Sequence, residues 1–142
     1  GFGKEELLRI YLKAFLIQLQ RRRQAEGAKQ VQVLDEKRLQ LVKFVNLVDE
    51  HYSKGYSVSE YASILLVSTR TLSDLTQHAL GKTPSQLIQE RIVLEAQRLL
   101  LHSGLNINQI GYRLGFDDPS YFVKYFKKHT NISPTEFRKA IS

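Results

Sequence analysis

The sequence predicts an all-α protein, and three observations support this fold class. Apolar residues recur at spacings of three and four along several stretches, as they do on the buried face of a helix. No stretch alternates apolar and polar residues at the period of two that is typical of strands. Most of the periodic stretches follow a Ser, Thr or Asp residue that would cap a helix. The length of 142 residues allows one domain or two small ones.

Two long amphipathic helices are expected in the first third of the chain. The first covers residues 4–23, and its apolar face comprises Leu7, Leu8, Tyr11, Leu12, Phe15, Leu16 and Leu19. The second covers residues 35–53, and Gly55 would end it in the left-handed conformation. Residues 24–33 are polar and contain a glycine, so we expect a linker there.

This pattern predicts two parts with different roles. Residues 1–34 would form a linker or dimerisation helix with its connector, and residues 35–142 would form a separate domain. The chain begins Gly-Phe-Gly rather than with methionine, so we expect it to be a piece of a longer protein.

A pair of short helices follows, and each begins at a capping residue. Ser57 and Glu60 form a capping box ahead of a helix over about residues 58–65. Ser68 would cap the next helix, over about residues 69–79. Only a few residues separate the two, so a tight turn must join them.

A long helix is then predicted from Pro84 to about Leu101. Thr83 and Gln86 form a capping box at its start, with proline at the favoured first position. Gly104 breaks the pattern after it. About twenty residues span about 30 Å, close to the distance of about 34 Å between successive major grooves on one face of DNA.

The tail of the chain repeats the short-helix pattern. A helix is expected over residues 107–114, and Asp118 would cap another that reaches about His129. Ser133 and Glu136 form the capping pattern of a final short helix.

The middle and the tail of the chain correspond residue by residue. The offset is 49 before the turn and 50 after it. The pairs are Ala62 with Gly111, Leu65 with Leu114, Leu72 with Phe122, Leu75 with Tyr125, Thr76 with Phe126, Thr83 with Ser133, and Leu87 with Phe137. A small residue where two helices cross, a tight turn and a second helix are typical of a helix-turn-helix unit. We therefore expect two such units, over about residues 57–80 and 107–130, joined by the long helix over about residues 84–102.

The exposed face of each second helix is the candidate DNA-reading surface. In the first copy Arg70 would bond guanine, Ser73 several base edges, and Asp74 a cytosine amino group. In the second copy Tyr121 offers its ring to a thymine methyl group and Lys124 reaches guanine. The candidate phosphate contacts are Thr69, Gln77, Lys82, Lys127, Lys128 and Arg138.

The basic charge of the chain favours a polyanionic partner or a membrane surface. The formal net charge is +7. Residues 1–34 and residues 120–142 each carry a net charge of +4, whereas residues 35–119 carry −1. The first helix-turn-helix unit is therefore not basic, and charge alone does not assign DNA binding to it.

The second copy resembles the signature of the AraC/XylS transcription regulators. The residues that carry this resemblance are Gly115-Phe-Asp-Asp-Pro-Ser-Tyr-Phe-Val-Lys-Tyr-Phe-Lys-Lys-His-Thr-Asn-Ile-Ser-Pro-Thr-Glu-Phe-Arg138. The runs Ser68-x-x-x-Leu72-x-x-Leu75 and Gly81-Lys-Thr-Pro84 are similar to that family's first motif, so the resemblance covers about residues 35–142. It implies a seven-helix domain whose base-contacting positions fall on Arg70, Ser73, Asp74, Ser120, Tyr121 and Lys124.

The resemblance also implies partners. Members usually activate transcription, so double-stranded DNA and RNA polymerase are expected, and the protein would be cytoplasmic. A sensory or dimerisation domain is common, so a homodimer would form through residues 4–23 or through a missing sensory domain.

Three residues depart from the family pattern: Asp74 at a reading position, Thr76 in place of a core aromatic, and Gly111 in place of alanine. The first unit would then bind weakly or read a different base pattern.

Other classes of function are less favoured. A protein-interaction module that has lost DNA binding would fit the near-neutral middle of the chain. The four histidines lack metal-ligand spacing and the chain has no cysteine, so we expect no enzyme, no metal and no cofactor. No apolar run reaches the length of a membrane span, and we expect the helix over residues 4–23 to pack on a domain or a subunit rather than on a membrane.

Overall fold

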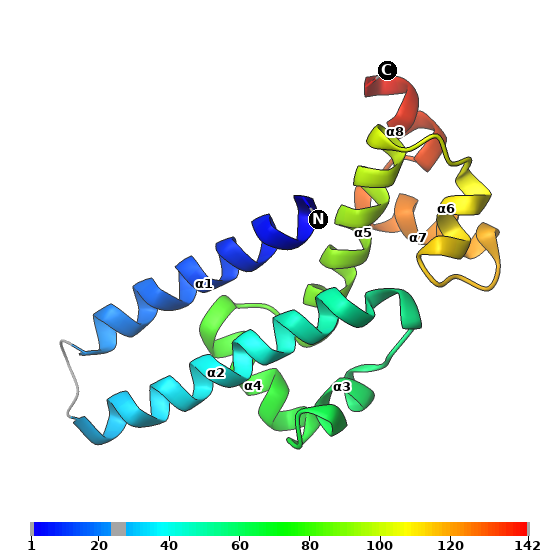
Figure 1. Cartoon of the computed structure of the whole chain (residues 1–142). Helices are drawn as coiled ribbons and strands as arrows, with labels where there is room; N and C mark the ends of the chain where they lie inside the picture. Colours follow the sequence, from blue (N-terminus) through cyan, green and yellow to red (C-terminus); the bar gives the residue numbers. More distant parts are fainter. Residues whose placement is uncertain (1, 24–27, 142) are drawn as a thin grey trace. The chain divides into compact units, whose positions relative to one another are not determined.

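The computed structural model describes residues 2–23 and 28–141, and within these ranges the regular elements are all helices (Figure 1). This confirms the predicted all-α class. The chain divides into two compact units. The first comprises residues 1–50 and 56–87, and the second comprises residues 51–55 and 88–142.

The first unit contains four helices: α1 (Phe2–Arg23), α2 (Ala28–His51), α3 (Val58–Ile64) and α4 (Thr69–Leu80). Helices α1 and α2 run antiparallel (Figure 1). The buried face of α1 consists of Tyr11, Phe15 and Leu19, and α1 packs against α4. An ion pair of 3.2 Å between Lys4 and Asp49 links α1 to the end of α2.

The predicted linker over residues 24–33 is wrong for residues 28–33. Helix α2 begins at Ala28, and residues 24–27 lie outside the described part of the chain. Leu34 is buried in one cluster with Phe15, Leu19 and Leu41. Leu34 therefore gains stability for this part of α2 through contacts with α1, which the polar sequence of the stretch does not reveal.

Aromatic contacts organise the core of the first unit. Tyr61 on α3 is fully buried, and its ring meets the rings of Phe44 and Tyr56 edge to face at centroid distances of 5.7 and 5.6 Å. Leu72 of α4 and Leu87 of the following helix are buried in the same unit. This core holds α3 and α4 on the C-terminal part of α2.

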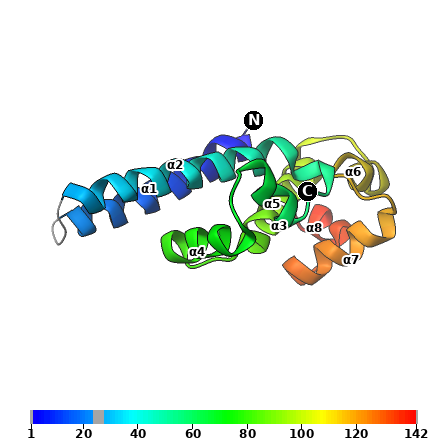
Figure 2. The same cartoon turned by 90° about the horizontal axis from the view of Figure 1, so that it is seen from below.

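The second unit contains most of α5 (Pro84–His102), then α6 (Ile107–Arg113), α7 (Pro119–Thr130) and α8 (Pro134–Ile141). Figure 2 shows α6 leading through a short loop to α7. The core residues come from three helices and are Ala96, Leu99, Leu100, Ile110, Leu114, Phe122 and Phe126. Residues 51–55, which include the 3-10 turn η1 (Tyr52–Lys54), belong to this unit.

Two arginines of the second unit serve its fold. Arg91 is buried, forms an ion pair of 3.4 Å with buried Glu95, and stacks over the ring of Tyr52. Arg138 of α8 donates hydrogen bonds to the backbone carbonyls of Leu100 at 2.9 Å and Leu105 at 2.7 Å. Its guanidinium therefore satisfies one carbonyl group in the last turn of α5, where carbonyls lack a partner within the helix, and another in the segment just after α5.

The capping residues expected from the sequence are present. Ser57 and Glu60 form the reciprocal capping box at α3, and Ser68 accepts from the backbone at the start of α4. A further capping box, between Asn106 and Gln109 at the start of α6, was not predicted, although its spacing is the same.

Candidate nucleic-acid interface

The two helix pairs are joined by turns with the same hydrogen bonds. In the first copy the N–H of Leu66 donates to the carbonyl of Ser63 at 3.1 Å, and that of Val67 donates to Ala62 at 3.0 Å. In the second copy, 49 residues later, the N–H of Gly115 donates to Tyr112, and that of Phe116 donates to Gly111, both at 3.0 Å. The sequence repeat is therefore a repeat of backbone structure.

Each helix pair crosses at the small residue that the sequence analysis singled out. Ala62 is buried in α3, and Gly111 is buried in α6. A Cβ atom at Gly111 would lie 3.1 Å from the Cβ atom of Phe122 on α7. The close approach explains why only a small side chain fits at this crossing.

Helix α4 has one buried face and one exposed, polar face. Leu72, Thr76 and Ala79 point into the core. Thr76 stands where the second copy has Phe126, and its hydroxyl donates to the carbonyl of Ser73 at 3.3 Å. The exposed side carries Thr69, Arg70, Asp74 and Gln77, with Ser73 half-buried between them.

Helix α7 has the same division, and its exposed face is basic. Phe122 and Phe126 are buried. Ser120, Tyr121, Lys124, Lys127 and Lys128 are exposed, and Tyr121 retains 67% of its accessible surface. The Lys124 ammonium lies 6.0 Å from the centre of the Tyr121 ring, within the range of a cation–π contact. The structure therefore groups all the second-copy reading candidates on one face.

The side chain of Asp118 caps the N-terminus of α7. Asp118 accepts a hydrogen bond of 2.9 Å from the backbone N–H of Ser120. This backbone hydrogen bond, together with the nearby Lys124 charge, lowers the pKa of Asp118 below its usual value. The group is therefore anionic at neutral pH and opposes an anion at this helix end.

Two of the candidate phosphate contacts have partners within the protein. The Lys82 ammonium lies 5.9 Å from the centre of the Tyr11 ring on α1. The Arg138 guanidinium donates to the carbonyls of Leu100 in α5 and of Leu105 beyond it, which removes it from the set we propose for DNA. The remaining candidates are exposed.

Two exposed residues on α6 were missed by the sequence analysis. Tyr112 and Arg113 stand next to the crossing residue Gly111, and Tyr112 retains 59% of its surface. Their counterparts in the first copy are Ser63 and Ile64. The sequence repeat assigns reading to the second helix of each pair, and only the exposure of Tyr112 and Arg113 in the structure distinguishes these residues of the first helix.

Within the described residues no group of three His, Cys, Asp or Glu side chains is arranged to hold a metal ion. None of the helices in the described ranges is long and apolar enough to cross a bilayer.

Comparison with known proteins identifies relatives of this arrangement. A family model described as "Helix-turn-helix domain" matches residues 61–140. The lactose operon transcription activator of Staphylococcus xylosus is 29% identical over 136 residues, which cover 96% of this chain and 48% of that protein. An uncharacterised helix-turn-helix-type transcriptional regulator of Bacillus subtilis, YisR, is 34% identical over 95 residues, and the match covers 67% of this chain and 33% of the relative. The chain thus spans a third to a half of these two relatives.

Solved structures share the fold. A transcriptional regulator of Chromobacterium violaceum, described as an AraC-type DNA-binding domain-containing protein, matches with a TM-score of 0.66 and 29% identity over 76% of this chain and 96% of that one. The DNA-binding domain of AdpA, solved in complex with a target DNA, matches with a TM-score of 0.64 and 29% identity over 70% of this chain and 90% of that one.

Proposed function

The chain belongs to the AraC-type helix-turn-helix family of DNA-binding transcription regulators, and from this premise we propose that α4 and α7 read base edges in successive major grooves. The observation that carries the proposal is the duplication itself. Both copies share the turn hydrogen bonds, and both second helices bury one face and expose a polar one. Membership of a family of regulators also places the chain outside the enzymes.

In the first unit, Arg70, Ser73 and Asp74 would contact bases. A guanidinium can donate two hydrogen bonds to guanine, and a carboxylate can accept from the amino group of cytosine. Thr69 and Gln77 flank these residues on the exposed side of α4 and would contact phosphates, as would Lys82 after leaving the Tyr11 ring.

In the second unit, Ser120, Tyr121 and Lys124 would contact bases, and Lys127 and Lys128 would contact phosphates. The Lys124 ammonium and the Tyr121 ring are already close, so the two side chains would enter the groove together. Arg113 is exposed on α6, the helix that packs against α7, and we add it to the proposed phosphate contacts.

The two units would contribute unequally to affinity. On α4 the charges of Arg70 and Asp74 cancel, whereas α7 carries three lysines. Each phosphate neutralised by a cation releases counterions and steepens the salt dependence of binding. The second unit would therefore supply most of the salt-dependent affinity, and the first would supply sequence discrimination.

We further propose that the whole protein activates transcription. The Staphylococcus xylosus relative, which matches nearly the full chain, is named as an activator of the lactose operon. An activator acts on RNA polymerase, which would be the protein partner. The protein would act in the cytoplasm, where the DNA of bacteria such as Staphylococcus xylosus lies.

The proposed dimer contact needs a different face of α1 from the one that the apolar pattern suggests. Tyr11, Phe15 and Leu19 are packed within the chain. Ile10 and Ile17, seven residues apart on α1, remain exposed. A homodimer through α1 would use these two residues, and the alternative is a dimer formed by another domain.

The experiment that tests the function is selection of bound sequences from random duplex DNA. Two enriched blocks about ten base pairs apart would support reading by both units. One block would restrict reading to a single unit. Enrichment of no sequence, with retention that depends only on salt, would overturn the proposal for this chain.

Variants then assign the blocks to the helices. Arg70→Ala and Lys124→Ala should each relax base preference at a separate position of the selected site, with a loss of about 1–3 kcal/mol. Lys43→Ala removes an exposed charge from α2 and should leave base preference unchanged. Unchanged preference in both reading variants would refute the assigned faces.

A further inference from the structure

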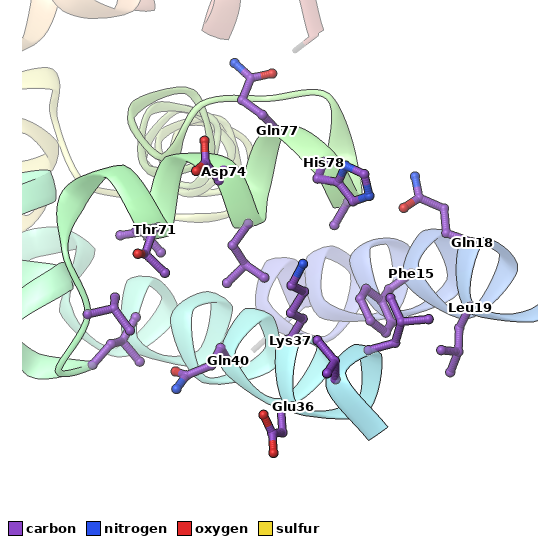
Figure 3. Close-up of a pocket in the computed structure, with 17 residues that line it drawn as sticks. Phe15, Gln18, Leu19, Glu36, Lys37, Gln40, Thr71, Asp74, Gln77 and His78 are labelled. Atoms are coloured by element: carbon purple, nitrogen blue, oxygen red, sulfur yellow. The ribbon is translucent and has the colours of Figure 1, made fainter. Parts of the chain in front are cut away.

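A groove of about 810 Å³ lies in the first unit between α1, α2 and α4 (Figure 3). Its walls are largely apolar, and they include Phe15 and Leu19 from α1, Leu34 from α2, and Leu75 and Ala79 from α4. Sites for small molecules typically have volumes of about 300–1,000 Å³ and apolar walls with few polar groups. The groove has the size and lining of such a site.

Two polar groups of α2 meet this groove without a partner among the described residues. The Lys37 ammonium extends from α2 toward the space between α4 and α1 (Figure 3), and it forms no ion pair within the described part of the chain. Gln40, three residues later on α2, also lines the groove, and its Oε1 atom is buried without a donor among the described residues. Its amide points away from the Lys37 ammonium (Figure 3), so the two groups meet different parts of the groove. A cation and a buried acceptor without a donor are both available to a ligand.

The carboxylates on the rim do not neutralise this arrangement. Glu36 and Asp74 line the groove, but Figure 3 shows both pointing away from the space where the Lys37 ammonium lies. The His78 side chain lies between α4 and α1 in the same view. The groove is therefore apolar inside, with the ammonium of the exposed Lys37 at its rim and the buried Gln40 acceptor at another point.

We propose that this groove binds a small aromatic anion that carries a hydrogen-bond donor. The apolar walls would cover the rings, the Lys37 ammonium would pair with the anionic group, and the donor would reach Gln40 Oε1. An ionised partner makes the stronger hydrogen bond, so Lys37 sets the requirement for an anion. The unsatisfied acceptor sets the requirement for a donor.

Such a ligand would lie directly against the proposed first reading helix. Leu75 and Ala79 of α4 form one wall, and Asp74 and Gln77 on the rim belong to the proposed DNA face. The ligand would therefore bias the position of α4 and change DNA affinity. This last step rests on the proposed function, whereas ligand binding does not.

The test uses 1-anilinonaphthalene-8-sulfonate as the probe, because it combines two aromatic groups, an anion and an N–H donor. Titration of the folded chain, followed by fluorescence and by amide NMR shifts, should give saturable binding. Shifts should be confined to amides of α1, α2 and α4. Shifts centred on the basic helix α7, or fluorescence that does not saturate, would overturn the proposal.

Paired variants identify the polar contacts. Lys37→Met should weaken probe binding about tenfold or more, as expected for loss of a charge-assisted hydrogen bond. Gln40→Leu should weaken it by a smaller factor. Lys43→Met removes an exposed lysine of α2 that does not line the groove, and should leave binding within about twofold. Equal affinity in Lys37→Met and Lys43→Met would refute the site.

A separate DNA titration keeps the two proposals distinguishable. If the probe binds in the groove and DNA affinity does not change, the ligand site stands and its coupling to DNA fails. If the chain does not bind DNA, the NMR and fluorescence results still decide the ligand site. If the groove instead closes on a protein segment, the probe gives no saturable binding and the small-molecule proposal is refuted.

Discussion

A Cβ atom at Gly115 would lie 1.9 Å from the backbone carbonyl oxygen of Ser53. The turn of the second helix-turn-helix unit thus packs directly on residues 51–55, which belong to the same unit. Gly115 also has a φ of 95°, which side-chain-bearing residues rarely adopt. The glycine is therefore required twice, by its backbone conformation and by the approach of Ser53.

Gly115→Ala should destabilise the second unit strongly. The methyl group must displace backbone atoms of Ser53 rather than a flexible side chain, and the φ angle adds strain. A loss of at least about 3 kcal/mol in unfolding free energy is expected. Denaturant unfolding monitored by circular dichroism measures it. Gly104→Ala, where a Cβ atom would meet nothing within 4 Å, is the matched control, and an equal effect of both changes would contradict the explanation.

Leu66→Gly should have the opposite effect in the first unit. Leu66 holds the equivalent turn position with a φ of 61° and is 92% exposed. Glycine removes the left-handed strain of about 1–2 kcal/mol, gives up little burial, and costs some unfolded-state entropy. A net stabilisation of about 0.5–1 kcal/mol should appear as stronger protection of α3 and α4 amides in hydrogen exchange. Leu66→Ala separates the effects, because it removes the side chain and keeps the strain.

Tyr61→Phe should be neutral or should stabilise the first unit by about 1 kcal/mol. The hydroxyl of Tyr61 is buried and lacks a hydrogen-bond partner within the described residues, while the ring makes the aromatic contacts. Thermal unfolding at pH 7 measures this effect. Tyr61→Leu, which removes the edge-to-face contacts, should destabilise the unit instead.

The same residue predicts a loss of stability in alkaline solution. Burial, followed by the Tyr56 and Glu60 charges, raises the pKa of Tyr61 to about 12. The unfolded chain loses this proton near pH 10, so it binds fewer protons than the folded chain between about pH 10 and 12 and is favoured there. Tyr61→Phe should reduce the decline in stability over this window, and an identical decline in both proteins would contradict the assignment.

Glu95→Gln should destabilise the second unit by about 3 kcal/mol, because Arg91 is only 4% exposed and would lose its charge partner. Burial raises the pKa of Glu95, but the hydrogen bonds and charges of Arg98 and Arg91 outweigh it, so the pKa lies below its usual value. The ionised carboxylate of Glu95 therefore adds to the free energy of unfolding above its pKa in the unfolded chain, near 4.5. This stabilisation is lost as the pH falls through the lower pKa that Glu95 has in the folded chain.

Urea unfolding between pH 3 and 7, read from the m-value and midpoint, checks this prediction. The parent protein should lose stability on acidification below about pH 4.5. Glu95→Gln should start lower and show a weaker acid dependence. A parallel pH dependence in the two proteins would show that other carboxylates control acid unfolding.

The short helices could be predicted from the sequence because their signals are local. Ser57, Ser68 and Asp118 each cap a helix within three residues of themselves, and the repeat fixed the pairing of helices. The capping box of Asn106 has the same local signal and was overlooked. Local side-chain chemistry was thus sufficient for the helix-turn-helix units.

The interactions that were not predicted span long stretches of the chain. Arg138 reaches carbonyls 33 to 39 residues away, and nothing near it in sequence distinguishes that role from a phosphate contact. Leu34 is helical because it packs with Phe15 and Leu19 of another helix. The groove around Lys37 likewise requires three helices in register, which periodicity alone does not specify.

The carboxylate at the start of α7 yields a prediction for DNA binding. The pKa of Asp118 is lowered by the hydrogen bond from the backbone of Ser120, so its carboxylate is charged at neutral pH. Asp118→Asn keeps a capping acceptor and removes the anion. Affinity for duplex DNA should rise about threefold at low salt, because the carboxylate near this helix N-terminus repels the DNA phosphates, and the gain should shrink as salt screens the charges. Fluorescence anisotropy with a labelled duplex at two salt concentrations measures this. Asp118→Ala loses the cap as well and should unfold more easily. A gain in affinity confined to the alanine variant would show that flexibility of the helix end, not its charge, limits binding.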